Sequence, residues 1–170
     1  MDDMDGRKAL LKASKIKKGR ILDVGMGDCG CMSFFLAKKG FDVIGIDRSP
    51  IAIHDSRKCA LKDRFKGSFQ AKRANAEKMP FSNHEFDAVV AYHALHHVDN
   101  VLKVINEMFR VCRKDGHVII SDLHEKGRKS YAHIPDDGKL LNKIEILLSK
   151  HTKSIRKIIT QNNMMFICRN

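Results

Sequence analysis

The amino-acid sequence predicts an α/β fold: a doubly wound, mostly parallel sheet of seven strands, with helices on both faces and a C-terminal antiparallel hairpin. Short apolar runs alternate with amphipathic stretches of helical length, which is the pattern of parallel strands joined by helices. Glycines at positions 25, 27 and 30 follow the first apolar run, as expected where a strand turns sharply into a helix. The last two strand-like runs are separated by three polar residues, which suits a hairpin and is too short for a crossover helix. A length of 170 residues fits a single domain over residues 1–170.

The first half of the chain supplies three of the strands. Residues 7–18 place Ala, Leu and Ile among lysines at helical spacing, so we expect a helix in the N-terminal segment 1–18 that ends at Gly19. The strands that follow are short and apolar, and each is bounded by glycine or polar residues. In chain order, the predicted elements are the strand Arg20–Val24, the helix Met32–Lys39, the strand Phe41–Ile46, a polar helix after Pro50 and the strand Ser68–Ala74.

The second half supplies two more strands and the hairpin. An almost entirely apolar strand is followed by a helix with one apolar face, and a turn at Lys114–Gly116 leads into the next strand. Residues 154–169 are predicted to close the sheet as a hairpin around the polar residues Gln161–Asn163. The predicted elements are the strand Phe86–Ala91, the helix Val101–Cys112, the strand His117–Ser121, the helix Lys139–Ser149 and the hairpin strands Ser154–Thr160 and Met164–Arg169.

Composition excludes several classes of protein. No apolar run approaches the roughly 20 residues of a membrane span, and the acidic N-terminus lacks the apolar core of a secretory signal. The cysteines are odd in number, five, and the closest pair, Cys29 and Cys31, lacks the second pair of a zinc site, so we expect a reducing cytoplasm and no metal. The 32 Lys and Arg residues against 20 Asp and Glu give a net charge of +12, which leaves a polyanionic partner such as nucleic acid open.

The glycine cluster carries the first functional signal. The run Gly25-x-Gly27-x-x-Gly30 follows a strand and opens a helix, whose N-terminal amides can bind an anion. Asp47 lies twenty residues after Gly27, at the end of the second predicted strand, where a carboxylate accepts hydrogen bonds from ribose hydroxyls. Together these features predict an adenosine-containing ligand. A nicotinamide enzyme normally needs a second nucleotide-binding half and a substrate domain, for which 170 residues leave little room.

Four further segments point to one family. The segment Asn75–Phe81 reads Asn-Ala-Glu-Lys-Met-Pro-Phe and leads into an apolar strand, Asp23 precedes the glycines, and Ala94–His97 and Arg110–Gly116 follow in order. This series resembles the class I, Rossmann-like S-adenosylmethionine-dependent methyltransferases, and is most similar to their type 11 small-molecule branch. The resemblance runs from about residue 18 to the closing hairpin and implies S-adenosyl-L-methionine as the cofactor.

The resemblance also implies the residues of a cofactor site. The glycines would pack against the methionine end, Asp23 would support the loop and the cofactor's amino group, and Asp47 would hold both ribose hydroxyls. Asn75 stands where the family usually has Asp facing the adenine amino group, and an Asn oxygen can accept the same hydrogen bond. The implied set is Asp23, Gly25, Met26, Gly27, Asp47, Arg48, Asn75, Ala76, Glu77 and Ala91.

Candidates for the acceptor side follow the fourth predicted strand. Parallel-sheet enzymes bind ligands at the carboxyl ends of strands, so we expect Tyr92, His93 and His96 to lie beyond the reactive sulfur, where a histidine can act as a base near neutral pH. Such a base is needed only when the acceptor must lose a proton. The remaining histidines with polar neighbours are expected at the surface, namely His54, His84, His124, His133 and His151.

The leading hypothesis is therefore a cytoplasmic methyltransferase that acts on a small metabolite. The Asn/Asp-Pro-Pro-Tyr and Pro-Cys signatures of base-methylating enzymes are absent from the sequence, and only residues 124–138 offer a lid, so the pocket is expected to be open or closed by a second subunit. Two alternatives stay open: an RNA or protein acceptor docked on the basic surface, and a non-catalytic cofactor-binding module that regulates a partner. The acceptor atom and the oligomeric state are not fixed by the sequence.

Overall fold

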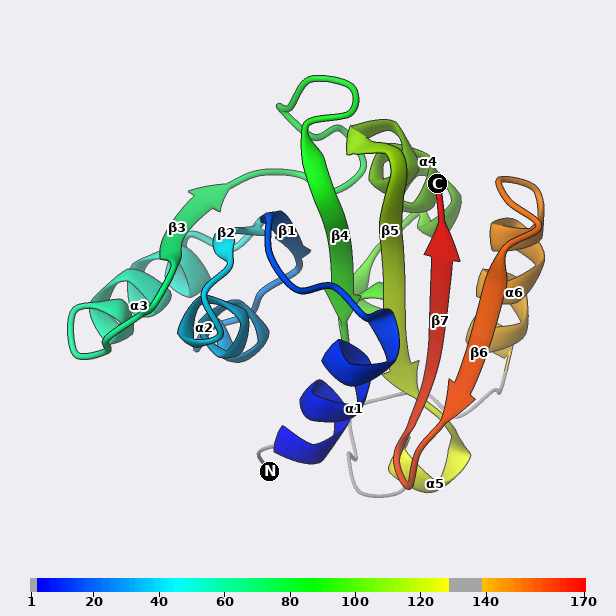
Figure 1. Ribbon diagram of the computed structural model, residues 1–170, viewed down its shortest axis with the longest axis horizontal. Helices are drawn as coiled ribbons and strands as arrows, with labels where there is room; N and C mark the ends of the chain where they lie inside the picture. The colour runs from blue at the N-terminus through cyan, green and yellow to red at the C-terminus, as the bar shows by residue number, and fades with distance from the viewer. Residues whose placement is uncertain (1–2, 129–138) are drawn as a thin grey trace.

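The computed structural model describes residues 3–128 and 139–170 and contains a seven-stranded sheet in the order β3-β2-β1-β4-β5-β7-β6 (Figure 1). The first five strands pair in parallel, while β7 is antiparallel to both β5 and β6. The predicted fold class is thereby confirmed, hairpin included. The strands are β1 (Arg20–Val24), β2 (Asp42–Asp47), β3 (Ser68–Arg73), β4 (Phe86–Tyr92), β5 (Cys112–Leu123), β6 (Ile155–Ile159) and β7 (Asn163–Arg169).

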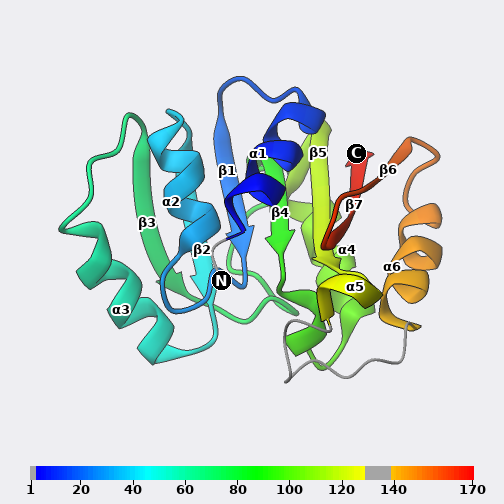
Figure 2. The same ribbon diagram turned by 90° about the horizontal axis from the view of Figure 1, so that it is seen from below.

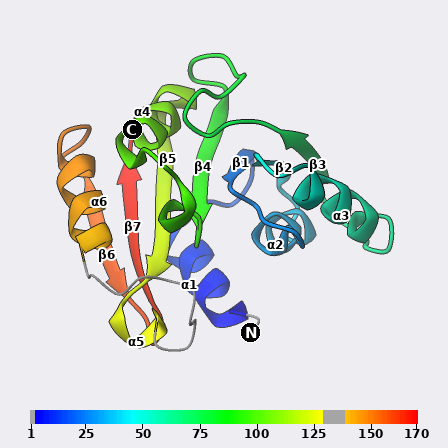
Figure 3. The same ribbon diagram turned by 180° about the vertical axis from the view of Figure 1, so that it is seen from behind.

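Helices cover both faces of this sheet. Leu10 of α1 and Phe35 of α2 pack with Ile21 and Val90 in one apolar cluster, whereas Ile105 of α4 and Ile144 of α6 pack with strand residues on the opposite face. Accordingly, α1 lies in front of the sheet in Figure 1, and α4 lies in front in Figure 3. The helices are α1 (Met4–Ser14), α2 (Cys31–Lys38), α3 (Pro50–Ala60), α4 (Val101–Val111), α5 (Glu125–Arg128) and α6 (Lys139–Ser149), with a 3₁₀ turn η1 at Leu95–His97.

The sheet is strongly twisted, as expected for right-handed strand twist over seven strands. β1 is foreshortened in Figure 1 and seen along its length in Figure 2. β7 is seen along its length in Figure 1 and is foreshortened in Figure 2. The carboxyl ends of β1, β2 and β4 nevertheless meet at one edge, because these strands are parallel neighbours. Within the described part of the chain, no helix is both long enough and apolar enough to cross a membrane.

The N-terminal helix lies earlier in the chain than the predicted residues 7–18. Asp3 caps it by accepting a hydrogen bond from the Gly6 amide at 3.1 Å, and Lys15 adopts a left-handed conformation that ends it after Ser14. An aspartate before the first turn satisfies an amide that the helix itself leaves unpaired. The shift places Asp3 against the sheet.

β5 is longer than the predicted strand His117–Ser121, at both ends. The predicted turn at Lys114–Gly116 is a bulge within this strand: Phe86 pairs with Cys112 and Ala88 with His117, so the register shifts between them. The left-handed backbone of Asp115 accommodates the extra residues. At the other end β5 continues through Asp122, because it pairs with β7 up to Asn163.

Candidate functional site

The glycine loop leaves the carboxyl end of β1 and is fixed to β2 by its backbone. The amides of Gly25 and Met26 both donate to the carbonyl of Ile46, at 2.9 and 3.0 Å. Gly25 has a φ of 73°, and a β-carbon there would lie 2.7 Å from the β-carbon of Ala94. Both the backbone conformation and the lack of space therefore exclude a side chain at this position. Gly27 also has a positive φ of 68°, but a β-carbon at this position would meet nothing within 4 Å. The loop therefore presents bare backbone to open space at Gly27.

Asp47 at the end of β2 is held by two backbone amides. Its Oδ2 atom accepts from Gly27 at 3.1 Å and its Oδ1 atom accepts from Ser49 at 2.9 Å. The twenty-residue spacing in the sequence has thus become a direct contact between the glycine loop and the carboxylate. Because each carboxylate oxygen accepts more than one hydrogen bond, both oxygens keep capacity for hydroxyl donors.

A cavity of about 220 Å³ adjoins this contact. Its polar wall includes Asn75, whose Oδ1 atom accepts from the Glu77 amide at 2.9 Å, and Glu77, whose Oε1 atom accepts from the Asn100 amide at 2.9 Å. At the rim, exposed Arg48 pairs with Asp99 at 3.0 Å. Seven residues of the predicted cofactor site line this smaller cavity: Gly25, Gly27, Asp47, Arg48, Asn75, Ala76 and Glu77.

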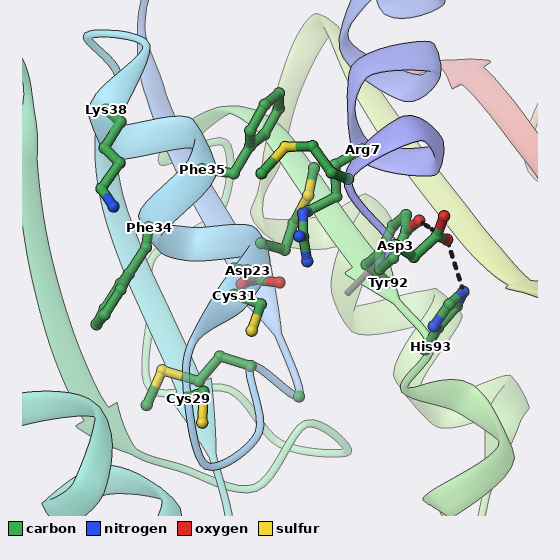
Figure 4. A pocket seen from close by; sticks show the side chains of 14 residues that line it. Asp3, Arg7, Asp23, Cys29, Cys31, Phe34, Phe35, Lys38, Tyr92 and His93 are labelled. Atoms are coloured by element: carbon green, nitrogen blue, oxygen red, sulfur yellow. Dashed lines mark hydrogen bonds and ion pairs between the residues drawn. The ribbon is translucent and has the colours of Figure 1, made fainter. Parts of the chain in front are cut away.

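A larger cavity of about 610 Å³ lies on the other side of the glycine loop, between α1, α2 and the end of β4 (Figure 4). Two more of the predicted residues, Asp23 and Met26, line it, together with Tyr92 and His93. The rest of its wall is mainly apolar and includes Met4, Met32, Phe34 and Phe35. Gly25 and His93 line both cavities, so the two cavities meet at these residues.

Asp23 is an ionisable group with almost no exposure to solvent. Only 1% of its surface is exposed, and its carboxylate accepts a hydrogen bond from the Ser33 hydroxyl at 2.6 Å. Burial raises the pKa of Asp23 from its ordinary value of 3.8 to about 6, because the charged form loses hydration. A cationic group in the larger cavity would compensate for that lost hydration.

A polar network on the opposite wall joins three distant segments of the chain. Asp3, which caps α1, accepts hydrogen bonds from the Tyr92 hydroxyl at the end of β4 and from the Nδ2 atom of Asn163 at the start of β7. The Oδ1 atom of Asn163 in turn contacts Nε2 of His93. Figure 4 shows Tyr92 and His93 on either side of the Asp3 carboxylate. Neither Asp3 nor Asn163 is among the site residues predicted from the sequence.

The third acceptor-side candidate, His96, lies elsewhere. Its Nδ1 atom is 2.8 Å from Oδ1 of Asp122 in β5, and the two side chains are only 7% and 2% exposed. Neither residue lines either cavity, whereas neighbouring His97 lines the smaller one. A catalytic role for His96 stays a prediction.

The remaining candidates are placed as follows. Ala91 is fully buried in β4 and lines neither cavity. His54, His84 and His151 are exposed, as expected, although His84 and His151 make hydrogen bonds. His124 is half-buried against the Thr160 carbonyl, and His133 lies outside the described residues. Among residues 3–128 and 139–170, no group of three or more His, Cys, Asp or Glu side chains could hold a metal ion.

Known proteins resemble this chain in sequence and in fold. The sequence profile of a family described as "Methyltransferase domain" matches residues 22–120. A ubiquinone biosynthesis O-methyltransferase of Vibrio cholerae is 30% identical over 149 residues, which cover 86% of this chain and 59% of that protein. A ubiquinone/menaquinone biosynthesis C-methyltransferase of Sinorhizobium fredii is 26% identical over 179 residues, or 97% and 68% of the two chains. The crystal structure of a SAM-dependent methyltransferase from Aquifex aeolicus superposes with a TM-score of 0.81 at 19% identity, over 95% and 88% of the two chains.

Proposed function

This chain belongs to the methyltransferase-domain family, with the Rossmann-like fold of S-adenosylmethionine-dependent methyltransferases, and we propose that it transfers the methyl group of S-adenosylmethionine to a small-molecule acceptor. The observation that carries the proposal is the meeting of the two cavities at Gly25 and His93. A cofactor that spans the glycine loop would have its adenosine in one cavity and its reactive end facing the other. The chain spans 59% of the length of the Vibrio cholerae relative.

The residues present fit such a cofactor. The open space beside Gly27 admits a ligand close to the backbone, and Asp47 keeps acceptor capacity for two ribose hydroxyls. The smaller cavity would take the adenine between Ala76 and Glu77. Asp23 would receive the positively charged amino group of the methionine end, which explains why an ionisable side chain is buried beside the loop.

The chemistry divides between the cofactor and the protein. When bound, the cofactor supplies a methyl group on a sulfonium, which is already a good leaving group. The protein's task is to orient the acceptor in line with that methyl group and to exclude water. The apolar side chains of Met4, Met32 and Phe35, which line the larger cavity, would exclude water, and Tyr92 and His93 would orient the acceptor.

The size and lining of the larger cavity support a small molecule as the acceptor. A volume of about 610 Å³ is typical of sites for small ligands, which are mostly apolar with a few polar groups. The two relatives described above are named for O- and C-methylation in quinone biosynthesis, which supports the same class of acceptor.

The proposal is tested by calorimetry with S-adenosylhomocysteine and with NAD. We expect micromolar binding of the first and no measurable binding of the second. Asp47→Ala should weaken S-adenosylhomocysteine roughly 10- to 150-fold, since hydrogen bonds to a charged group contribute about 1.5–3 kcal/mol. Tight binding of NAD without S-adenosylhomocysteine would overturn the proposal.

Asp42→Ala is the matched control for that variant. Asp42 begins the strand that Asp47 ends, and it accepts a hydrogen bond from the Ser68 hydroxyl at 2.9 Å, away from both cavities. It should leave the affinity unchanged. If both variants bind alike, the ribose is held by residues other than Asp47.

A further inference from the structure

A third cavity, of about 300 Å³, lies between the glycine loop and α3. Two residues of the loop and four residues of α3 or just after its end line it: Asp28, Cys29, Asp55, Lys58, Cys59 and Lys62. Both cysteines in this set are exposed, and neither is in a disulfide. A small cavity with two exposed thiols on its wall is a candidate for thiol chemistry.

A hydrogen bond from α3 holds the glycine loop beside this cavity. The Ser56 hydroxyl donates to the carbonyls of Gly27 and Asp28, at 3.1 and 3.2 Å. Cys29 is the next residue of the loop after Asp28. Cys59 lies three residues after Ser56, which is about one turn further along the same face of α3. The contact at Ser56 therefore brings the two cysteines to the same side of the junction between the loop and α3.

The ionisable groups around Cys29 agree with this placement. The pKa of the Cys29 thiol is raised, first by loss of hydration and then by the neighbouring thiols of Cys31 and Cys59 and the carboxylates of Asp28 and Asp55. Interactions between groups near the surface are screened over short distances. The effect of Cys59 on Cys29 thus indicates that the two thiols are neighbours.

The other three cysteines are placed differently. Cys31 is exposed, but it lines the larger cavity and not the third one. Cys112 and Cys168 are buried, and burial raises the pKa of each thiol to about 12, so neither is a nucleophile at neutral pH. No three potential ligands in the described part of the chain come together as a metal site. Cys59 is therefore the thiol that can pair with Cys29.

We propose that Cys29 and Cys59 form a redox-active dithiol, which small-molecule disulfides such as glutathione disulfide oxidise to a protein disulfide. One cysteine thiolate attacks the small disulfide, forms a mixed disulfide and releases the first small thiol. The second cysteine thiolate attacks the protein sulfur of the mixed disulfide and releases the other small thiol. Two protein thiols are oxidised, one small disulfide is reduced to two thiols, and the two protons pass to the released thiols. Lys58 and Lys62 on the cavity wall attract the carboxylates of such an oxidant.

The disulfide joins the glycine loop to α3, because Cys59 lies thirty positions after Cys29 in the chain. The fold stays intact, since Ser56 already holds the loop against this helix. Cys29 also lines the larger cavity, on the side away from Tyr92 and His93 in Figure 4. Oxidation therefore alters one wall of that cavity as well.

Peptide mapping of the whole chain tests the proposal. The reduced protein is incubated with glutathione disulfide, its remaining thiols are alkylated, and the tryptic peptides are analysed by mass spectrometry. We expect peptide 21–38, which holds Cys29 and Cys31, to be joined to peptide 59–62, with the bond at Cys29 and the alkyl group on Cys31. Four outcomes would overturn the proposal: a bond between Cys29 and Cys31, a glutathione adduct without a protein disulfide, a cross-link between two copies of the chain, or full alkylation.

Thermal denaturation of the oxidised and reduced protein gives a second measurement. A disulfide that closes a loop of about thirty residues should raise the Tm by roughly 7–15 °C, and a reductant should reverse this rise. Cys29→Ser and Cys59→Ser should each abolish the rise. Cys31→Ser is the matched control, because it removes an exposed thiol of the same loop and should leave the rise unchanged. A rise that persists in Cys59→Ser, or that is lost in Cys31→Ser, would refute the pairing.

Discussion

The two aspartates on opposite walls of the larger cavity behave differently. Asp23, at the end of β1, is almost completely buried, and burial raises its pKa to about 6. Asp3, before α1, accepts hydrogen bonds from Tyr92, Asn163 and Gly6, and its pKa is lowered. The protein has already supplied the donors that Asp3 needs, whereas Asp23 keeps its charge at a cost in stability. A buried carboxylate with too few donors is suited to a cationic ligand, and one with enough donors is suited to orienting its neighbours.

The largest effect is expected from Asp23→Asn. Removing one partner of a buried charge pair costs about 2–5 kcal/mol, so calorimetry should show S-adenosylhomocysteine binding weakened roughly 30- to 5,000-fold. The ligand-free variant should nonetheless melt at a higher temperature than the wild type at pH 7, because the buried charge is gone. A variant that binds the ligand more weakly but is more stable without it indicates a residue whose role is to bind the ligand.

Asp3→Asn makes the same chemical change on the other wall and serves as the comparison. Its affinity for S-adenosylhomocysteine should stay within about threefold of the wild type. If both variants lose affinity equally, the division of roles between the two aspartates is wrong.

The pH dependence of stability gives the next largest effect. The folded-state pKa of Asp23 lies above its unfolded value of 3.8, so the folded state binds the proton more tightly, and stability falls as pH rises from about 4 to about 6. A shift of about two pKa units corresponds to roughly 3 kcal/mol. The difference in unfolding free energy between Asp23→Asn and wild type should therefore grow over this range and then level off. Denaturant unfolding at several pH values measures it, and a difference independent of pH would contradict the assignment.

The smallest effect is expected from Asp3→Ala. Loss of the helix cap, together with loss of the acceptor for Tyr92 and Asn163, should lower the unfolding free energy by about 2 kcal/mol. This change is opposite in sign to the one expected for Asp23→Asn. Asp5→Ala is a suitable control, since Asp5 is fully exposed in the first turn of α1 and pairs only with Lys8 at 3.8 Å among the contacts described. Equal losses in thermal denaturation would assign the effect to helix charge and not to the cap.

The two walls also differ in how far the sequence predicts them. The proposed cofactor side is built from a strand, a loop and an acid within some 25 residues, and its glycine spacing is visible in the sequence. The opposite wall depends on the contact between Asp3 and Asn163, which lie 160 positions apart. The sequence predicts Asn163 in the hairpin turn, because a polar residue next to Gln161 and Asn162 gives no indication that it begins a buried strand. The contact of His96 with Asp122 is not predicted either, since the sequence predicts that the strand ends at Ser121.

The order and type of the helices and strands follow from the periodicity of apolar residues in the sequence. The residues at which each element begins and ends depend on tertiary contacts. The bulge in β5 is defined by its pairing with β4, which the sequence does not show. The start of α1 depends on Asp3 acting as the helix cap, whereas the sequence shows only an acidic N-terminal segment. Of the ten predicted cofactor residues, seven line the smaller cavity, Gly25 among them lines both cavities, Asp23 and Met26 line only the larger one, and Ala91 lies within β4.

The contact between Asp3 and Asn163 also sets an order of events during synthesis on the ribosome. The glycine loop, Asp47 and β4 emerge well before β7, so the nascent chain holds the parts of a cofactor site while Asp3 and His93 still lack their shared partner. Pairing of β7 with β5 is the step that brings Asn163 between them. The wall that carries Tyr92 and His93 is therefore the last part of the larger cavity to be completed.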